Sequence, residues 1–461
     1  MENLKTNKMG AMPMFPLILS MSLPAMFSML IQSLYNVVDS IFVAQLGENA
    51  LTAVSLAYPI QMLMVSVAVG TGVGINSLVS RRLGERDQDA ANKAATHGFF
   101  LAVFSSVAFA LFGAIFSRPF IGAFTQDGEI LQMGTSYLSI VTILSFGSFI
   151  VVNFEKTLQA TGNMIYPMVF QLTGAIINII LDPIMIFGYL GCPAMGVAGA
   201  ALATVIGQIA SMALSVYVAF FKEHEVEITL RGFRFKGATI RDIYAVGLPA
   251  IVMQSIGSVL IMGLNGILAA FSGAAVSVLG VYYKLQSFVF MPVFGLTQGV
   301  MPIMGYNYGA RNKRRMMDAL RIGTIIAVVI MAVGTLIFML LPVQLLEMFN
   351  ASEEMMRVGV MALQTISWCF VPAALGILFS TLFQAVGCGT RSLIISVLRQ
   401  LVVILPVAYL LSRIGLEYVW WSFVIAEVVS LVASIVIFLD LYKKRIAHLA
   451  DEPVVAPEGA S

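Results

Sequence analysis

Long apolar stretches follow one another along almost the whole chain, and they limit its possible folds more than any other feature. Many run for about 20 residues or more, the length that an α-helix needs to cross the hydrocarbon core of a bilayer. Only 11% of the 461 residues are charged, whereas soluble proteins carry roughly a quarter. The sequence therefore predicts an all-α polytopic membrane protein.

We expect twelve transmembrane helices. The first stretch is too long and too polar at its end for a cleaved signal peptide, and no small-residue cleavage site follows it. The expected spans are 15–45, 51–79, 94–117, 132–160, 165–189, 195–221, 240–271, 276–307, 317–342, 356–386, 391–412 and 417–442.

The basic residues indicate an orientation, because Lys and Arg gather in cytoplasmic loops. With the N-terminus inside, the outer loops hold only Arg118, Arg357 and Arg413. Most of the 26 Lys and Arg residues then lie inside, in segments near 5–8, 81–93, 222–241, 311–321 and 443–445. We therefore expect both termini in the cytoplasm and the protein in the plasma (bacterial inner) membrane. Because these charges follow topology, they do not indicate nucleic-acid binding.

An internal repeat organises the chain. "SLPAMFSMLIQSL" at 22–34 resembles "GLPAIVMQSIGSV" at 247–259, which aligns Pro24 with Pro249 at an offset of 225 residues. The same offset relates "RRLGERD" around Gly84 to "YNYGARN" around Gly309, and "LQATGN" to "FQAVGC". Later, "ATVIGQIAS" resembles "SFVIAEVVS" at an offset of 219. Three matches at one offset predict two equivalent halves.

Each half contains six spans, so both halves enter the membrane from the same side as parallel repeats. We expect an N-lobe at 1–222, a cytoplasmic linker at 223–239, a C-lobe at 240–445 and a disordered cytoplasmic tail at 446–461. Two such bundles would enclose a central cleft, and rocking of one against the other would give alternating access. Pro24, Pro183 and Pro249 are the expected structural or hinge positions.

The repeat pattern resembles the multidrug and toxic compound extrusion (MATE) family over about residues 10–445. The resemblance is carried by "SLPAMFSMLIQSLYNVVDSIFVAQLG", by the "GERD" and "GARN" loops, and by "GVAGAALATVIGQ". Asp39 in the first span and "NIILD" in the fifth look more like the DinF-type branch than the NorM-type branch. This resemblance implies a transporter rather than an enzyme, with small organic molecules as substrates.

An aspartate in the apolar run "NIILDPIMIF" is the main candidate for a functional site. Asp182 and Asp39 lie about 11 and 9 Å below the expected outer surface, and Thr204 lies about 14 Å below it. Asn36 shares a helix face with Asp39, and Asn178 shares one with Asp182. All of these residues come from the first half and lie at a similar depth.

Two nearby carboxylates in low dielectric cannot both stay ionised without a proton or a cation. Pro183 leaves the carbonyl of Ile179 without its helical donor, which adds another oxygen. The set therefore fits a proton or a sodium ion, with no other cofactor or resident metal. The alternative is an aspartate satisfied only by hydrogen bonds between helices. In the resembled family, the positions matching Asp39, Asn178, Asp182 and Thr204 form the N-lobe cation site.

The second half does not repeat this site, because Asp39 aligns with Leu264. NorM-type members have acids in spans seven and ten, where this chain offers only Gln254, Gln364 and Gln384. A C-lobe cation site of that type is therefore not expected. A possible C-lobe polar cluster at mid-depth consists of Lys284, Arg399 and Glu427. It is either a structural ion pair or a group linked to substrate or protons.

The sequence indicates the substrate-binding residues less clearly than it indicates the acidic site. Gln32, Tyr35, Asn153 and Met29 are the candidate contacts near Asp39. The 28 methionines could line an adaptable pocket, or they could simply pack the core.

The leading hypothesis is a cation-coupled antiporter, expected to be a monomer, that exports amphipathic and often cationic compounds. One alternative is a lipid-linked oligosaccharide flippase of the same superfamily, although such proteins usually have more spans and a basic cavity. The other is a membrane-embedded enzyme. That reading is disfavoured because the three histidines and three cysteines are scattered and no GxxxxGK[ST] loop is present.

Overall fold

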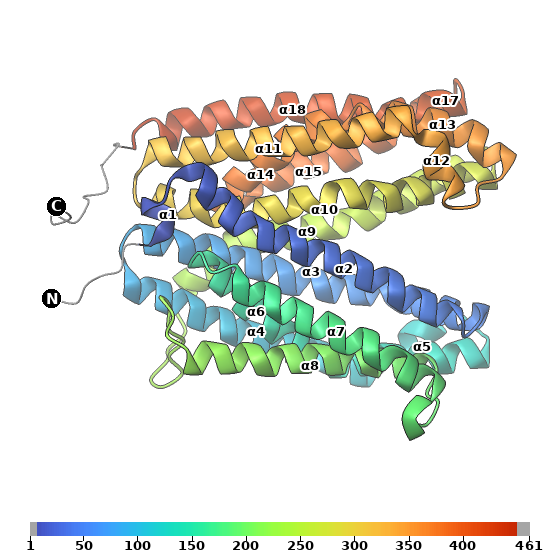
Figure 1. Cartoon of the computed structure of the whole chain (residues 1–461), viewed down its shortest axis with the longest axis horizontal. Helices are drawn as coiled ribbons and strands as arrows, with labels where there is room; N and C mark the ends of the chain where they lie inside the picture. The colour runs from blue at the N-terminus through green and yellow to red at the C-terminus, as the bar shows by residue number, and fades with distance from the viewer. Residues whose placement is uncertain (1–6, 450–461) are drawn as a thin grey trace. The chain divides into compact units, whose positions relative to one another are not determined.

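The computed structural model describes residues 7–449, and every regular element in that range is a helix (Figure 1). The expected tail lies outside the described residues from position 450 onwards. The α-helices are α1 (Lys8–Ala11), α2 (Met14–Ala44), α3 (Glu48–Gly84), α4 (Gln88–Gly122), α5 (Gly128–Ile143), α6 (Phe146–Ala160), α7 (Ile165–Phe187), α8 (Val197–Phe221), α9 (Gly237–Ala269), α10 (Gly273–Gly309), α11 (Lys313–Leu340), α12 (Pro342–Glu347), α13 (Glu353–Ser367), α14 (Phe370–Ala385), α15 (Gly389–Val397), α16 (Leu405–Ser412), α17 (Leu416–Val419) and α18 (Trp421–Leu441). A 3-10 turn, η1 (Tyr189–Gly191), and two π-helical segments, η2 (Leu398–Ile404) and η3 (Tyr442–Ile446), complete the set.

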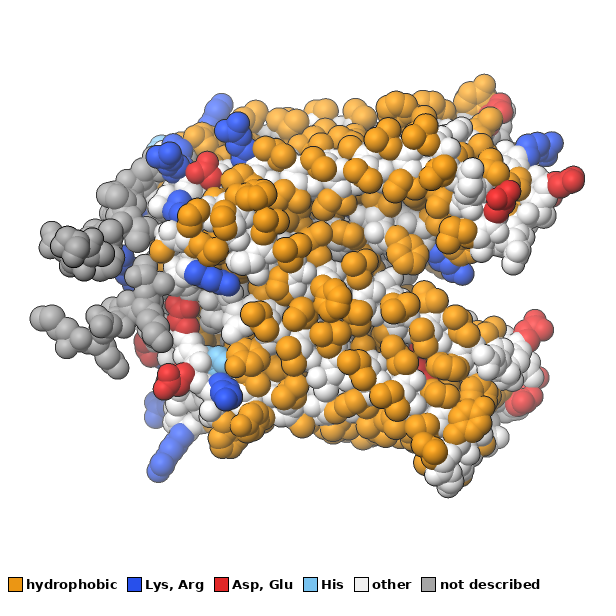
Figure 2. Space-filling view, viewed as in Figure 1, with side chains coloured by type: hydrophobic (Ala, Val, Ile, Leu, Met, Phe, Trp, Pro, Cys, Tyr) orange, Lys and Arg blue, Asp and Glu red, His pale blue; other side chains and the backbone are white. Residues whose placement is uncertain are grey.

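Ten helical segments in this range are long and apolar enough to cross a membrane. Two bent pairs, α5–α6 and α13–α14, bring the number to twelve if each pair forms one span. Hydrophobic side chains cover the visible face along the middle of the helices, and charged side chains gather near the helix ends (Figure 2). The expected all-α polytopic fold is therefore confirmed.

The two bent pairs occupy equivalent positions in the repeats. The α5–α6 pair bends by 44° and the α13–α14 pair by 47°. Just before each bend a side-chain hydroxyl donates to a backbone carbonyl: Thr142 to Leu138 at 2.6 Å, and Ser367 to Gln364 at 2.9 Å. Such bonds compete with the helical ladder and bend helices. The sequence predicted these two regions as single spans and did not predict the bends.

The turns after α3 and α10 are also equivalent. Arg86 and Arg311, again 225 residues apart, both adopt a positive φ, of 59° and 56°. The next residue caps the following helix in each case. Asp87 accepts from the backbone of Ala90, and Asn312 accepts in the same way from Arg315, both at 3.0 Å. The repeat seen in the sequence is thus a repeat of backbone geometry.

The chain forms two compact units. The N-unit consists of Phe27–Arg82 and Asp87–Ile251, and the C-unit takes in residues up to Met26, Leu83–Arg86 and those from Val252 onwards. The unit boundaries inside α2 and α9 therefore fall two residues after Pro24 and two residues after Pro249. Each of these helices contributes its first part to one unit and its remainder to the other. The lobes expected from the sequence, with limits at 222 and 240, stay a prediction.

Each unit has its own apolar core. In the N-unit, α3, α4, α5, α6 and α8 contribute to a buried cluster that includes Tyr137, Leu138 and Phe149. In the C-unit, aromatic rings meet between α10, α11 and α14. The ring of Phe338 lies 5.1 Å from that of Phe370 and 6.5 Å from that of Tyr282. Each functional region described below belongs to one unit.

The segment expected to be a linker is folded onto α4 within the N-unit. Three of its backbone N–H groups donate to α4 side chains: Glu227 to Asn92 at 3.0 Å, Thr229 to Thr96 at 3.2 Å, and Lys236 to His97 Nε2 at 2.9 Å. Its Phe233 ring stacks on Phe100 at 4.6 Å. These contacts anchor the segment to α4, and its role as a linker at 223–239 stays a prediction.

Candidate functional site

Close packing of α7 against α8 places the central polar residues. A Cβ on Gly207 would lie 2.7 Å from the carbonyl oxygen of Gly174, and one on Gly174 would lie 2.7 Å from Ser211 Oγ. Only glycine permits this approach of the two helices. Asn178 lies one turn after Gly174, and Thr204 lies one turn before Gly207, so both polar side chains are held in the same narrow interface.

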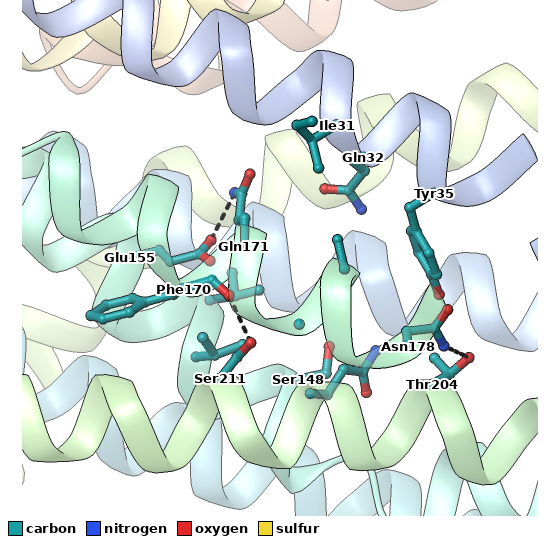
Figure 3. A pocket seen from close by; sticks show the side chains of 15 residues that line it. Ile31, Gln32, Tyr35, Ser148, Glu155, Phe170, Gln171, Asn178, Thr204 and Ser211 are labelled. Carbon is teal, nitrogen blue, oxygen red and sulfur yellow. Dashed lines mark hydrogen bonds between the residues drawn. The ribbon is translucent and has the colours of Figure 1, made fainter. Parts of the chain in front are cut away.

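The side-chain amide of Asn178 joins Asp182 to Thr204. With its nitrogen towards the carboxyl group, it donates to Asp182 Oδ2 at 2.9 Å, and its oxygen accepts from Thr204 Oγ1 at 3.1 Å. In the opposite orientation, drawn in Figure 3, the nitrogen donates to Thr204 and Asp182 loses this donor. The first orientation satisfies both ends of the amide. All three residues are buried, and Asp182 is fully enclosed.

Asp39 approaches the same carboxyl group from α2. The carboxyl groups of Asp39 and Asp182 lie within hydrogen-bonding reach of each other. Such a bond requires a proton on one of them, since two carboxylates can only accept. The Oδ1 atom of each residue is buried and has no hydrogen-bond partner among the described residues. The sequence prediction that α2 and α7 bring two acids together is thus matched by the geometry.

The carboxylate oxygens of Asp39 and Asp182 that have no partner among the described residues determine which ions this site could bind. Two like charges at short range in a low dielectric repel strongly unless a proton or a cation lies between them. No group of three or more His, Cys, Asp or Glu residues that could hold a metal occurs within residues 7–449. A bound cation would therefore depend on the two carboxylates and on neutral oxygens such as those of Asn178 and Thr204. This donor set fits a proton or a monovalent ion.

A pocket of about 150 Å³ lies beside this group (Figure 3). Tyr35 points from α2 towards Asn178 and Thr204, and Gln32 lines the pocket one turn earlier on α2. Glu155 and Gln171 form the far wall, where Gln171 Nε2 donates to Glu155 Oε2 at 3.2 Å. The pocket therefore combines an acidic, amide-rich wall with apolar helix faces.

The other residues selected from the sequence are less central. Asn36 is exposed and lines no described pocket, although it shares a helix with Asp39. Met29 is half-buried and also lies outside the pocket lining. Asn153 is buried, and neither end of its amide has a partner among the described residues. Pro183 lies within α7, next to Asp182.

The expected C-lobe cluster is only partly assembled. Arg399 Nη1 donates to Glu427 Oε1 at 3.1 Å, so these two residues form an ion pair between η2 and α18. Lys284 is exposed, and its ammonium group lies 5.9 Å from the ring centre of Phe349. Lys284 therefore lies beside Phe349, and no ion pair links it to Glu427 in the described structure.

Several pocket residues were not predicted from the sequence as contacts of this site. Gln208, Ser148 and Gln171 line the pocket, and the side-chain oxygens of Gln208 and Gln171 are buried without a partner in the described structure. Gln208 follows Thr204 by one helical turn, so its i, i+4 spacing was an available signal. Ser148 follows the α5–α6 bend, whose geometry only the structure reveals. Glu155 on α6 is buried in the pocket wall.

Comparisons with known proteins agree with this architecture. The family model MatE matches residues 24–184 and 249–410, one match in each repeat. The multidrug export protein MepA of Staphylococcus aureus (strain MSSA476) is 27% identical over 438 residues, covering 93% of this chain and 94% of MepA.

Solved structures are similar over nearly the whole chain. A multidrug resistance MATE family transporter of the MOP superfamily, in an outward-facing conformation, superposes with a TM-score of 0.89 at 29% identity and covers 96% of this chain and 98% of its own. A MOP superfamily transporter from Pyrococcus furiosus, whose binding pocket is described as having reverse polarity that suggests a different function, gives a TM-score of 0.88 at 28% identity and the same coverage. Since the family model spans both repeats, this chain belongs to the MatE family of multidrug and toxic compound extrusion transporters.

Proposed function

We propose that the protein is a cation-coupled antiporter that exports amphipathic, often cationic organic compounds by rocker-type alternating access. One observation carries the proposal: Asp39 and Asp182 face each other in a buried site where each has an oxygen without a partner among the described residues. Acids inside a membrane protein are costly and usually functional. An antiporter needs a site that alternately binds and releases a positive charge, and this need explains why two acids lie inside the membrane protein.

The relatives support the class of substrate. MepA is named a multidrug export protein, and the outward-facing structure is described as a multidrug resistance transporter. The pocket beside Asp39 has Gln32, Tyr35 and Glu155 in its wall, a surface suited to a cation with an apolar body. Asn153 and Met29 are proposed as outer contacts of the same substrate.

The coupling ion is a proton or a sodium ion, and we favour the proton. A proton needs one carboxyl group that changes its charge, which the Asp39–Asp182 pair supplies directly. Sodium needs several oxygens at ligand distance, and only two of the nearby groups, the carboxylates of Asp39 and Asp182, would carry charge. Asn178 and Thr204 would orient Asp182 in either case, and Asn36 is proposed as a peripheral member of the site.

Alternating access requires hinges, which we place at Pro24 and Pro249. These prolines precede the two unit boundaries inside α2 and α9 by two residues. A proline in a helix removes one hydrogen bond and weakens the ladder there. Pro183 would act locally, by freeing the carbonyl of Ile179 next to the ion site.

The remaining assignments extend the proposal. Asp39 and the "NIILD" segment favour the DinF-type branch over the NorM-type branch. The distribution of Lys and Arg favours cytoplasmic termini, and we propose a monomer in the plasma membrane. A lipid-linked oligosaccharide flippase is the alternative in the same superfamily. The described lining of the N-unit pocket contains Glu155 and no Lys or Arg, which argues against it, since a pyrophosphate-linked substrate needs basic residues.

Transport by the purified protein in lipid vesicles tests the proposal. Ethidium should move against its gradient when a proton gradient is imposed, and the Asp39→Asn protein should not move it. Uptake driven by a sodium gradient alone, without a pH gradient or a membrane potential, would reverse the choice of ion. Ethidium transport equal to that of protein-free vesicles under both gradients would refute the antiporter.

A further inference from the structure

The C-unit contains a second cavity, of about 360 Å³, between α9, α10, α14, η2 and α18. It occupies the position in the second repeat that the first pocket occupies in the N-unit. The offsets of 225 and 219 residues pair four lining residues of the two cavities: Gln32 with Gly257, Tyr35 with Leu260, Val152 with Ile377, and Gln208 with Glu427. The scaffold is shared, whereas the side chains differ.

An ion pair lies in the wall of this second cavity. Glu427 is buried, and its side chain keeps 10% of its exposure, whereas that of Arg399 keeps 27%. The bond to Glu427 is the only hydrogen bond that the Arg399 guanidinium makes to the described residues. A guanidinium has five N–H donors, so most of its donors are free for a ligand.

A π-helical segment delivers Arg399 to the cavity. Pro406 lacks the N–H that would bond the carbonyl of Val402 in an α-helix. The ladder preceding it widens into η2 (Leu398–Ile404), and Arg399 and Gln400 on consecutive positions both line the cavity. π-Helical turns are rare and occur frequently at functional sites. The distortion is specific to the second repeat, because α7 stays α-helical around the equivalent Pro183.

The rest of the cavity is mainly aromatic. Tyr282, Tyr283, Phe290 and Phe423 contribute rings to its wall. The hydroxyl group of Tyr283 is buried and has no hydrogen-bond partner in the described range. A planar apolar ligand body would therefore find ring faces to pack against, with an unused hydroxyl beside the ion pair.

The balance of charge selects the kind of ligand. The Arg399–Glu427 pair is neutral, so a purely cationic ligand would leave the site with a net positive charge, and a purely anionic ligand would leave it with a net negative charge. An uncompensated charge in a largely buried site is unfavourable. A ligand with both charges can give Arg399 a carboxylate and Glu427 an ammonium group, so that no charge is left alone.

We propose that the Arg399–Glu427 cavity is a binding site for zwitterionic aromatic compounds. Their carboxylate would accept from the Arg399 guanidinium, their cationic group would bind Glu427, and their rings would pack on Tyr283 and Phe290. The proposal rests on the proposed export function in one respect: these compounds are substrates only if the protein exports what it binds. It adds a second substrate class to the cations assigned to the N-unit pocket.

Three dansyl probes of similar size test the charge preference. Dansyl-lysine, labelled on its side chain, is zwitterionic, dansylcadaverine carries only the ammonium group, and dansyl-aminohexanoic acid carries only the carboxylate. Binding to the purified protein in lipid nanodiscs is followed by dansyl fluorescence without any ion gradient. We expect dansyl-lysine to bind at least about tenfold more tightly to this site than either singly charged probe.

Variants of the ion pair test whether Arg399 and Glu427 cause the preference for the zwitterionic probe. Arg399→Gln should weaken dansyl-lysine about tenfold and favour dansylcadaverine, and Glu427→Gln should shift the preference towards dansyl-aminohexanoic acid. Arg399→Glu combined with Glu427→Arg keeps a pair and should recover dansyl-lysine binding.

Lys284→Gln is the matched control, because it removes a cation of α10 outside the cavity and should leave all three affinities unchanged. Tyr283→Phe removes only a hydroxyl and should weaken dansyl-lysine about threefold.

A purely structural ion pair would give a different pattern. It would lower the thermal stability of the single variants without changing which probe binds best, and that result would refute the site. Should a single variant fail to give a monodisperse protein, the reversed pair and Tyr283→Phe still test the proposal. Equal affinities for the three probes in the unmodified protein would also overturn it.

The two proposals can fail separately. Zwitterion selectivity in a protein that exports no dye under any gradient would leave this site standing and refute the antiporter. Gradient-driven export of ethidium without zwitterion selectivity would do the reverse.

Discussion

The two units have pockets at equivalent positions, but their charged residues differ: the N-unit has two acids, and the C-unit has an acid paired with a base. In the N-unit, Asp39 and Asp182 face each other, and the lining of the adjacent pocket contains no Lys or Arg among the described residues. In the C-unit, Glu427 is paired with Arg399 at 3.1 Å. Two acids at short range need a proton or a cation between them, whereas an acid paired with a base is neutral as it stands. The two repeats therefore share a helical scaffold and carry different charged groups on it.

The C-unit replaces the paired acids by leucines. Asp39 aligns with Leu264, and Asp182, which precedes Pro183, aligns with Leu405, which precedes Pro406. Leu264 is fully buried. Leu405 lies against Gly263, since its Cδ2 would be 2.6 Å from a Cβ added there. Apolar side chains thus occupy both positions of the carboxylate pair, so a pair of acids like that of the N-unit is absent from this position.

The largest expected effect comes from removing the acids. Asp39→Asn and Asp182→Asn should each leave folding and membrane insertion largely intact, because Asn is isosteric and less costly to bury than an ionised Asp. Each should reduce coupled export to the rate of protein-free vesicles, because an amide neither titrates nor neutralises a cation. Ethidium transport under a proton gradient measures this.

The matched substitution in the C-unit is Leu264→Asn. It buries an amide at a cost of about 1–3 kcal/mol and should lower thermal stability, yet coupled export should persist. If Asp182→Asn transports normally while Leu264→Asn abolishes coupling, the ion site has been assigned to the wrong unit.

A smaller effect is expected from the amide that positions Asp182. Asn178→Leu removes a donor to a buried carboxylate, a loss of about 1–3 kcal/mol. The ion concentration that gives half-maximal export should therefore shift by about tenfold. Replacing Leu401, the counterpart of Asn178 ahead of Pro406, by Asn should leave that concentration unchanged. Equal shifts in the two variants would argue that neither unit is specialised for the ion.

Helix packing in the N-unit should respond to Gly207→Ala. The added Cβ would lie 2.7 Å from the carbonyl oxygen of Gly174, and overpacking of this kind costs about 1–3 kcal/mol. Thermal unfolding in detergent should therefore begin at a lower temperature. Gly266→Ala in α9 is the control, because a Cβ there meets nothing within 4 Å and alanine is the better helix former. A raised transition temperature for Gly207→Ala would show that α7 and α8 are free to separate.

The smallest effect concerns the anchored segment, which belongs to the N-unit alone. Phe233→Ala removes the ring that stacks on Phe100 at 4.6 Å, a contact worth about 0.5–1.5 kcal/mol. Hydrogen–deuterium exchange should rise at residues 225–236 while α7 and α8 stay protected. Unchanged exchange would mean that the backbone bonds to Asn92, Thr96 and His97 are enough to hold the segment.

Sequence by itself determined the all-α membrane fold and the twofold repeat. Apolar runs long enough to cross a bilayer leave little choice but helices, because backbone groups must be satisfied internally in hydrocarbon. The matched positions Arg86 and Arg311, and Pro24 and Pro249, kept their common geometry in the structure. Helix direction and depth alone placed Asp39 and Asp182 at a similar level, since both are fixed by the span limits.

Only the tertiary structure decided which of those residues touch. Depth alone cannot tell which way a side chain points around its helix, so it could not show that Asn36 is exposed or that Lys284 lies beside Phe349. Gln208 and Glu155 both line the pocket; Gln208 lies next to the glycine contact of α7 with α8, and Glu155 lies on α6, after the bend from α5. The widened π-turn that brings Arg399 to Glu427 depends on how η2 packs against α18. Rotation about a helix axis is set by packing between helices, which no single helix encodes.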